Sequence, residues 1–169
     1  MKTLSKKSFA VLEQEFPVLK ENQLTEIVGG QDSYSFTVAN GTFVNYYHED
    51  GNYSVYYPSD GGSSVVFDGV HVNGNTLPFQ GQDTACQLNG QIRVGSEYAS
   101  YFTLEDTVHE YGHYLQQQEM GTYKYIKDVG LNSIQTVYES DHSSQWYEQD
   151  ATQRGNDYMN QYYPGYYYY

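Results

Sequence analysis

The hydrophobic pattern changes its period near residue 102, and this change constrains the fold more than any other feature of the chain. Between residues 31 and 102, short apolar runs alternate with polar residues and are separated by Asn-Gly and Asp-Gly turn signals. Such period-2 runs predict antiparallel strands joined by hairpins. After residue 102, apolar residues recur at helical spacing. We therefore expect an α+β fold with an N-terminal antiparallel β region packed on a helical core.

The predicted strands are short and are bounded by glycine, asparagine or aspartate. The segment 74–90 carries many turn residues, and we expect it to be a loop. The strand at 91–94 lies just ahead of the helical part, where an edge strand could hold an extended peptide by β-addition. The expected strands are 33–38, 42–47, 53–57, 65–67, 70–72 and 91–94.

The first helix is expected over about 103–120. Thr103 is a typical N-cap residue with Asp106 three positions later. Gly121 is a typical helix stop. The core-facing stripe consists of Leu104, Val108, Tyr111 and Leu115.

An H-E-x-x-H motif occupies the middle of this helix. His109 and His113 stand four residues apart, so their side chains project from one face about one turn apart. Two imidazoles at that separation can bind a single Zn²⁺. Glu110 could then take a proton from a water on the metal. Gly112 between them would keep this face open, and the motif predicts a zinc site with Glu110 as general base.

A catalytic zinc also needs a third protein ligand and an open position. The metzincin pattern would place glycine at 116 and histidine at 119, but the chain has Gln116 and Glu119 there, which excludes that class. A second helix is expected from about 143, and its Glu148 fits the E-x-x-A pattern of glutamate-ligand zincins. The alternatives for the third ligand are Asp150, Glu139 and His142.

The stretch 107–158 resembles small zinc peptidase-like domains, some of which end bacterial polymorphic-toxin and repeat-rich secreted proteins. The resemblance implies a two-helix, zincin-like core of the gluzincin type, with zinc and peptidase-like chemistry but no named substrate. It also marks His142, which could stabilise an oxyanion or serve only in capping or packing. The matching residues are His109, Glu110, Gly112, His113, Gln116, Gly121, Tyr123, Ser133, His142, Trp146, Glu148, Ala151 and Gly155.

Residues 1–30 resemble a bacterial double-glycine leader, which a dedicated ABC exporter cuts after the second glycine. The segment has no net charge and no continuous apolar core, so an ordinary signal peptide is excluded. The resemblance implies cleavage between Gly30 and Gln31 and a secreted product. The alternative is an amphipathic helix followed by a Gly-Gly turn. The apolar positions of the leader pattern are Phe16, Leu19, Leu24 and Ile27.

Composition excludes some partners. A net charge of −13 with eight Lys+Arg leaves no basic stripe for nucleic acid. No apolar run approaches the roughly 20 residues of a membrane helix, so membrane insertion is not expected. Cys86 is the only cysteine, and we expect a buried small side chain there, with a zinc ligand or a latency switch as the alternatives.

We therefore expect a leader at 1–30, a zincin-like domain at 31–161 and a Tyr-rich, exposed or adhesive tail at 162–169. The predicted function is a secreted zinc metallopeptidase acting on a peptide or protein substrate. The alternative is a secreted binding or adhesive module, or a bacteriocin-like effector, with a structural or inactive zinc site. An intact Glu110 favours the enzyme, because a structural zinc site has no need of a general base.

Overall fold

The computed structural model describes residues 33–49, 51–77, 80–136, 139 and 141–166. The chain divides into two compact units, Met1–Gln31 and Asp32–Tyr169, and every described residue belongs to the second. The predicted leader at 1–30 and the last three residues of the predicted tail lie outside the described residues.

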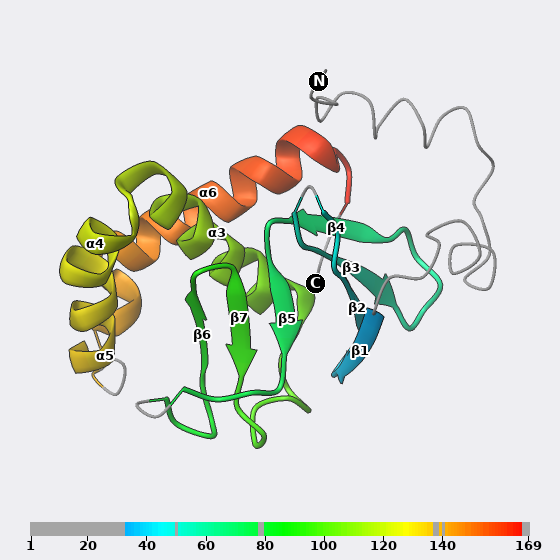
Figure 1. Ribbon diagram of the computed structural model, residues 1–169, viewed down its shortest axis with the longest axis horizontal. Coiled ribbons are helices and arrows are strands. Elements are labelled where there is room, and N and C mark those ends of the chain that lie inside the picture. The colour runs from blue at the N-terminus through cyan, green and yellow to red at the C-terminus, as the bar shows by residue number, and fades with distance from the viewer. Residues whose placement is uncertain (1–32, 50, 78–79, 137–138, 140, 167–169) are drawn as a thin grey trace. The chain divides into compact units, whose positions relative to one another are not determined.

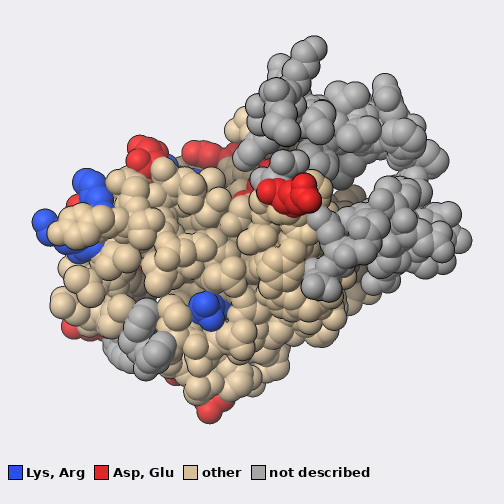
Figure 2. Space-filling view, viewed as in Figure 1, with Lys and Arg blue, Asp and Glu red and all other residues tan. Residues whose placement is uncertain are grey.

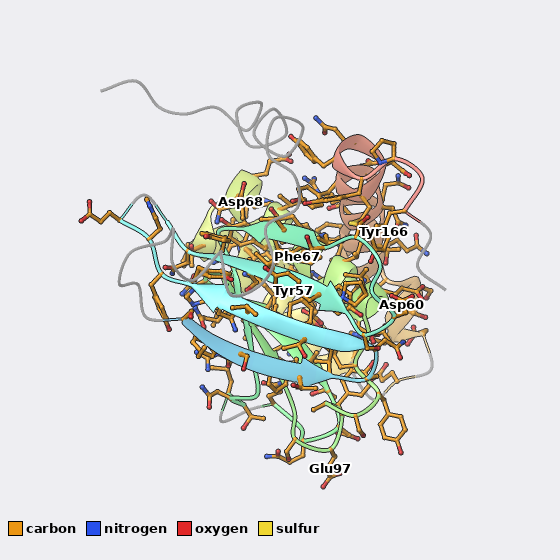
Figure 3. The ribbon with its side chains drawn as sticks, turned by 90° about the vertical axis from the view of Figure 1, so that its right-hand side faces the viewer. Tyr57, Asp60, Phe67, Asp68, Glu97 and Tyr166 are labelled. Atoms are coloured by element: carbon orange, nitrogen blue, oxygen red, sulfur yellow. The ribbon has the colours of Figure 1, made fainter. Side chains whose placement is uncertain are left out.

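The N-terminal part forms an antiparallel sheet with the order β1-β2-β3-β4 (Figures 1 and 3). This confirms the predicted antiparallel region. Phe43 and Tyr56 lie opposite each other in the register, with ring centroids 5.0 Å apart. Gly41 begins β2 and does not belong to the turn, and a Cβ there would stand 2.5 Å from the Tyr56 ring, so this position favours glycine. The strands are β1 (Ser33–Val38), β2 (Gly41–Tyr46), β3 (Tyr53–Pro58) and β4 (Val65–Asp68).

A second sheet of three strands has the order β5-β7-β6. Here β5 (His71–Asn73) pairs parallel with β7 (Gln91–Val94), and β6 (Ala85–Leu88) pairs antiparallel with β7. The prediction of a loop over 74–90 is therefore wrong at β6. Asn89 and Gly90, with φ of 51° and 73°, form the two-residue hairpin turn that joins β6 to β7. The strand β7 therefore lies in the middle of the sheet, and β5 and β6 are its edge strands.

The two sheets are joined by a buried side chain and not by a hairpin at Asp68-Gly69. The Asn45 amide of β2 donates to the Val72 carbonyl at 2.8 Å, and its oxygen accepts from the Val72 N–H at 2.7 Å. The Asn45 side chain therefore gives Val72 of β5 the hydrogen bonds that the backbone of a neighbouring strand would otherwise supply. This contact fixes the second sheet against the first.

Two long helices, α3 (Leu104–Met120) and α6 (Trp146–Tyr162), pack against each other and against the sheets (Figure 1). The predicted capping box of Thr103 and Asp106 is present at the start of α3. None of the described helices is both long and apolar enough to cross a membrane. The segments between them are α4 (Thr122–Tyr125), the π-helix η1 (Ile126–Gly130), α5 (Leu131–Thr136) and the 3₁₀ turn η2 (His142–Ser144).

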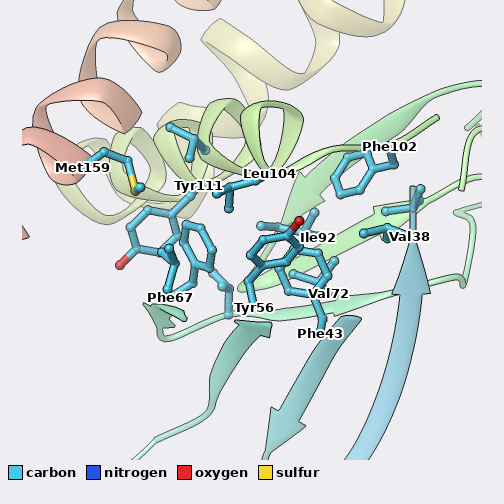
Figure 4. Packing of buried hydrophobic residues seen from close by; sticks show 14 of the residues in the cluster. Val38, Phe43, Tyr56, Phe67, Val72, Ile92, Phe102, Leu104, Tyr111 and Met159 are labelled. Atoms are coloured by element: carbon cyan, nitrogen blue, oxygen red, sulfur yellow. The ribbon is translucent and has the colours of Figure 1, made fainter. Parts of the chain in front are cut away.

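One hydrophobic cluster connects both sheets to α3 and α6 (Figure 4). Phe67 of β4 and Ile92 of β7 meet Tyr111 of α3 and Met159 of α6 in this cluster. The first residues of the Tyr-rich tail also belong here, because Tyr163 and Tyr166 pack against the cluster. The tail therefore begins as part of the core and does not stand free at these positions.

The described part of the face in Figure 2 carries only scattered Lys and Arg side chains.

Candidate metal centre

Three side chains converge between α3 and α6. Glu148 Oε2 lies 3.0 Å from His109 Nε2 and 3.1 Å from His113 Nε2. The three ligand atoms all lie within 4.8 Å of one another, so the group could hold a metal ion. Ligand atoms of a tetrahedral site with bonds of about 2.0–2.2 Å stand roughly 3.4 Å apart. The two Glu148–histidine distances differ from this value by only a few tenths of an ångström.

The close crossing of α3 and α6 places Glu148 opposite the histidines. A Cβ on Gly112 would lie 1.8 Å from the Ala151 carbonyl oxygen, and one on Gly155 would lie 2.1 Å from the Val108 carbonyl oxygen. The two glycines therefore let the helix backbones touch. Gly112 was expected to keep the histidine face open, but its side is filled by the α6 backbone. The small Ala151 does allow the approach that the E-x-x-A pattern predicted.

Gln116 determines which nitrogen of His113 carries the proton. The Gln116 side-chain N–H₂ donates to the Tyr147 carbonyl and to Asp150 Oδ2, both at 2.8 Å. This fixes the amide so that its oxygen accepts from His113 Nδ1 at 2.8 Å. His113 Nδ1 is then protonated, and Nε2 presents a lone pair toward Glu148.

Thr152 does the same for His109. Its hydroxyl donates to the Glu148 backbone carbonyl at 3.0 Å, which leaves the Thr152 oxygen to accept from His109 Nδ1 at 2.9 Å. His109 Nε2 therefore also faces the Glu148 carboxylate as an acceptor. Hydrogen bonds from the far side of each imidazole are typical of metal-ligating histidines.

This arrangement favours positive charge between the three ligand atoms, carried by a metal ion or by protons on the imidazoles. Two imidazole lone pairs and a carboxylate oxygen at 3.0 and 3.1 Å repel one another unless a proton or a metal ion lies between them. Without a metal, protons take this place. Burial acts to lower the pKa of His113, but Glu148, Glu110 and Gln116 together outweigh burial and raise that pKa. Burial likewise acts to raise the pKa of Glu148, but both histidines hold it far below its usual range.

The other Glu148 oxygen is held by residues from the segment between the long helices. Ser133 donates to Oε1 at 3.1 Å, and His142 Nε2 lies 3.3 Å from it. His142 Nδ1 is in turn 2.9 Å from the Thr136 hydroxyl. The structure therefore places His142 against the carboxylate of the third ligand. In this position it orients Glu148.

The segment α4–η1–α5 carries Ser133 and Thr136, and its buried residues pack against α6 beside the site. Tyr125 and Val129 are buried four residues apart and pack with Tyr147 of α6. The π-turn adds a residue to the helical register before Ser133. Ser133 and His142, which hold Glu148 Oε1, belong to the zinc peptidase-like pattern, whereas Thr136, which contacts His142, does not. Thr152 could have been found as the residue one turn after Glu148.

Glu110 lies beside the group with an unsatisfied carboxylate. It is 8% exposed, and its Oε2 is buried with no hydrogen-bond partner among the described residues. Burial raises the pKa of Glu110, although His113 and His109 oppose this. The exposed fractions of the His109, His113 and Glu148 side chains are 31%, 7% and 5%. The centre is therefore open to solvent on the His109 side.

The remaining candidates lie outside the group. Asp150 accepts from Gln116 and, at 2.6 Å, from Arg154 Nε, so it supports His113 through Gln116. Cys86 is half-buried, and burial, followed by the nearby Glu110, raises the pKa of its thiol to about 12. Among the described residues, neither Cys86 nor Glu139 joins the metal-ligand group.

Comparisons with protein-family models, with curated proteins and with solved structures gave no match to this chain.

Proposed function

We propose that this protein is a zinc-dependent metallopeptidase with a zincin-like core formed by α3 and α6. One observation carries the proposal: a buried Glu110 carboxylate oxygen, with no hydrogen-bond partner among the described residues, lies beside two histidines and a glutamate that could hold a metal ion. A structural zinc site is closed by four ligands and needs no such group. Leaving a carboxylate oxygen buried and unpaired costs about 1–3 kcal/mol or more, and a catalytic role accounts for that cost.

The chain's own residues divide the chemistry as follows. His109, His113 and Glu148 hold the metal, which when bound lowers the pKa of water and polarises a carbonyl. Glu110 accepts the proton of the attacking water and passes it to the leaving amine. The raised pKa of Glu110 suits this exchange, because a group that both takes and gives a proton works best with a pKa near the working pH.

Zinc is proposed over other metals from the ligand set. Two imidazoles and one carboxylate, with an open fourth position, match catalytic zinc sites. The same ligand set also occurs around non-haem iron. Metal analysis of protein purified without added metal discriminates the two, and about one zinc per chain is expected.

An extended peptide is the proposed substrate, because β6 is an edge strand beside the centre. Gln117 of α3 ties the β6–β7 hairpin to the catalytic helix: its oxygen accepts from Asn89 N and from Gln87 Nε2, both at 3.0 Å. A peptide strand added to β6 would therefore run close to α3.

The test compares Glu110→Gln with Glu105→Gln, the same substitution at an exposed position of α3. Hydrolysis of a quenched fluorescent peptide library should fall about 10²–10⁴-fold for Glu110→Gln, and bound zinc should stay at the parental level in both variants. Loss of zinc together with activity would point to a structural role. Absence of hydrolysis by the zinc-loaded parent across the library would leave a binding or adhesive module as the better proposal.

A further inference from the structure

A pocket opens beside the metal centre, between the start of β6 and the helix α3. We call it the β6–α3 pocket. Its volume is about 220 Å³. At roughly 30 Å³ for each water in the liquid, this is space for about seven waters, which is enough for a lysine or an arginine side chain. The lining residues are Asp83, Thr84, Ala85, Tyr98, Asp106, His109 and Glu110.

The charge of this lining is negative. Asp83, Asp106 and Glu110 supply carboxylates, and no lining residue is a lysine or arginine. Among the described residues, none of the three forms an ion pair with a lysine or arginine. Burial and the neighbouring carboxylates Asp106 and Glu110 raise the pKa of Tyr98 to about 12, which reflects the same negative potential.

The carboxylates differ in what already satisfies them. Asp106 is fixed, because its Oδ1 accepts from the Tyr98 hydroxyl at 3.0 Å and its Oδ2 from the Thr103 backbone N–H at 2.8 Å. Asp83 is exposed and makes no hydrogen bond or ion pair with another described residue. Glu110 Oε2 is buried at the edge of the candidate metal centre and has no hydrogen-bond partner in the described part of the chain. The pocket thus offers acceptors and a negative field, and it lacks donors to match them.

We propose that the β6–α3 pocket binds the side chain of a lysine or arginine of the substrate and so selects basic peptides. The inference rests on the proposed peptidase function and names its substrate class. A peptide paired with β6 would pass Thr84 and Ala85, which belong to the pocket lining, and could place one side chain between Asp83 and Asp106. The ammonium or guanidinium group would donate to the Asp83 carboxylate, which has no donor among the described residues, and would be attracted by the charge of Asp106.

The test measures binding and hydrolysis separately on the full chain loaded with zinc. The probes are two fluorescein-labelled pentapeptides of alanine with a central lysine or a central norleucine, which has the same four-carbon chain without the ammonium group. Fluorescence anisotropy should show about 10–100-fold tighter binding of the lysine peptide, the range of a hydrogen bond to a charged group. Added salt should reduce this difference, because the exposed Asp83 is screened.

Asp83→Lys should remove most of the preference. The matched control is Asp157→Lys, which changes the net charge equally at an exposed position of α6 outside the pocket. Equal loss in both variants would show general attraction to an acidic protein and would overturn the proposal. Equal binding of both peptides by the parent would overturn it as well. A second equivalent of bound zinc that Asp83→Lys removes would assign the pocket to a metal ion instead.

The hydrolysis assay separates this proposal from the proposed function. Cleavage of library peptides without preference for basic residues would overturn the pocket assignment and leave the peptidase standing. Lysine-selective binding that depends on Asp83, with no cleavage of any peptide, would support the pocket and overturn the peptidase.

Discussion

Gly112→Ala is expected to separate α3 from α6 and thereby to damage the metal centre. The added Cβ would lie 1.8 Å from the Ala151 carbonyl oxygen, whereas ordinary contact begins at 3.4 Å, so the helices would have to part by about 1.6 Å. Overpacking of this kind costs about 1–3 kcal/mol. The better helix propensity of alanine returns about 1 kcal/mol, and the clash is with backbone, which cannot rotate away. We therefore expect a loss near 2 kcal/mol.

The assay is thermal unfolding with and without zinc, together with calorimetric titration of zinc. A loss near 2 kcal/mol should lower Tm by roughly 4–8 °C. The affinity for zinc should also fall, because Glu148 lies on the displaced helix. Gly130→Ala is the matched control, since a Cβ there meets nothing within 4 Å. A Gly112→Ala protein with parental Tm and parental zinc affinity would refute the packing argument.

Four further results are expected. His113→Ala should lose most of the bound zinc, whereas metal retained at one equivalent in a folded variant would contradict the ligand assignment. Gln116→Leu should weaken zinc binding about 10–100-fold, because nothing then fixes the His113 tautomer; an unchanged affinity would argue against that role. In EDTA, His113 has a raised pKa, so its contribution to stability is complete below about pH 6.5 and is lost as the pH rises through the folded pKa. Glu148 has a lowered pKa, so its contribution is present above about pH 4.3 and is lost at lower pH. Thermal melts should therefore show a maximum from this pair near about pH 5–6 that His113→Ala removes. Mass spectrometry of culture medium should find a mature N-terminus at Gln31, and only full-length protein inside cells would contradict export.

The sequence by itself predicted the features that depend only on residues close together in the chain, such as helix faces, helix caps, strands and hairpin turns. The spacing of His109 and His113 placed both on one face of α3, because a helix repeats every 3.6 residues whatever packs against it. The Thr103 cap and the strands at 33–38 and 91–94 were equally local. The Asn89-Gly90 dipeptide also predicts the β6–β7 hairpin. The many turn residues between 74 and 90 led instead to the prediction of a loop.

Tertiary structure decided which distant residues meet. The parallel pairing of β5 with β7 and the bridge from Asn45 to Val72 join segments far apart in the chain, and no local period encodes such pairs. The contact of His142 Nε2 with Glu148 Oε1 depends on how the segment between α3 and α6 folds back onto α6. The sequence predicts that Gly112 leaves the histidine face of α3 open, but the backbone of α6 packs against this glycine. The spacing of Glu148 to Ala151 predicted Glu148 as the candidate third ligand. The orientation of Glu148 by Ser133 and His142 depended on packing, because side-chain contacts between elements form only once the chain has folded.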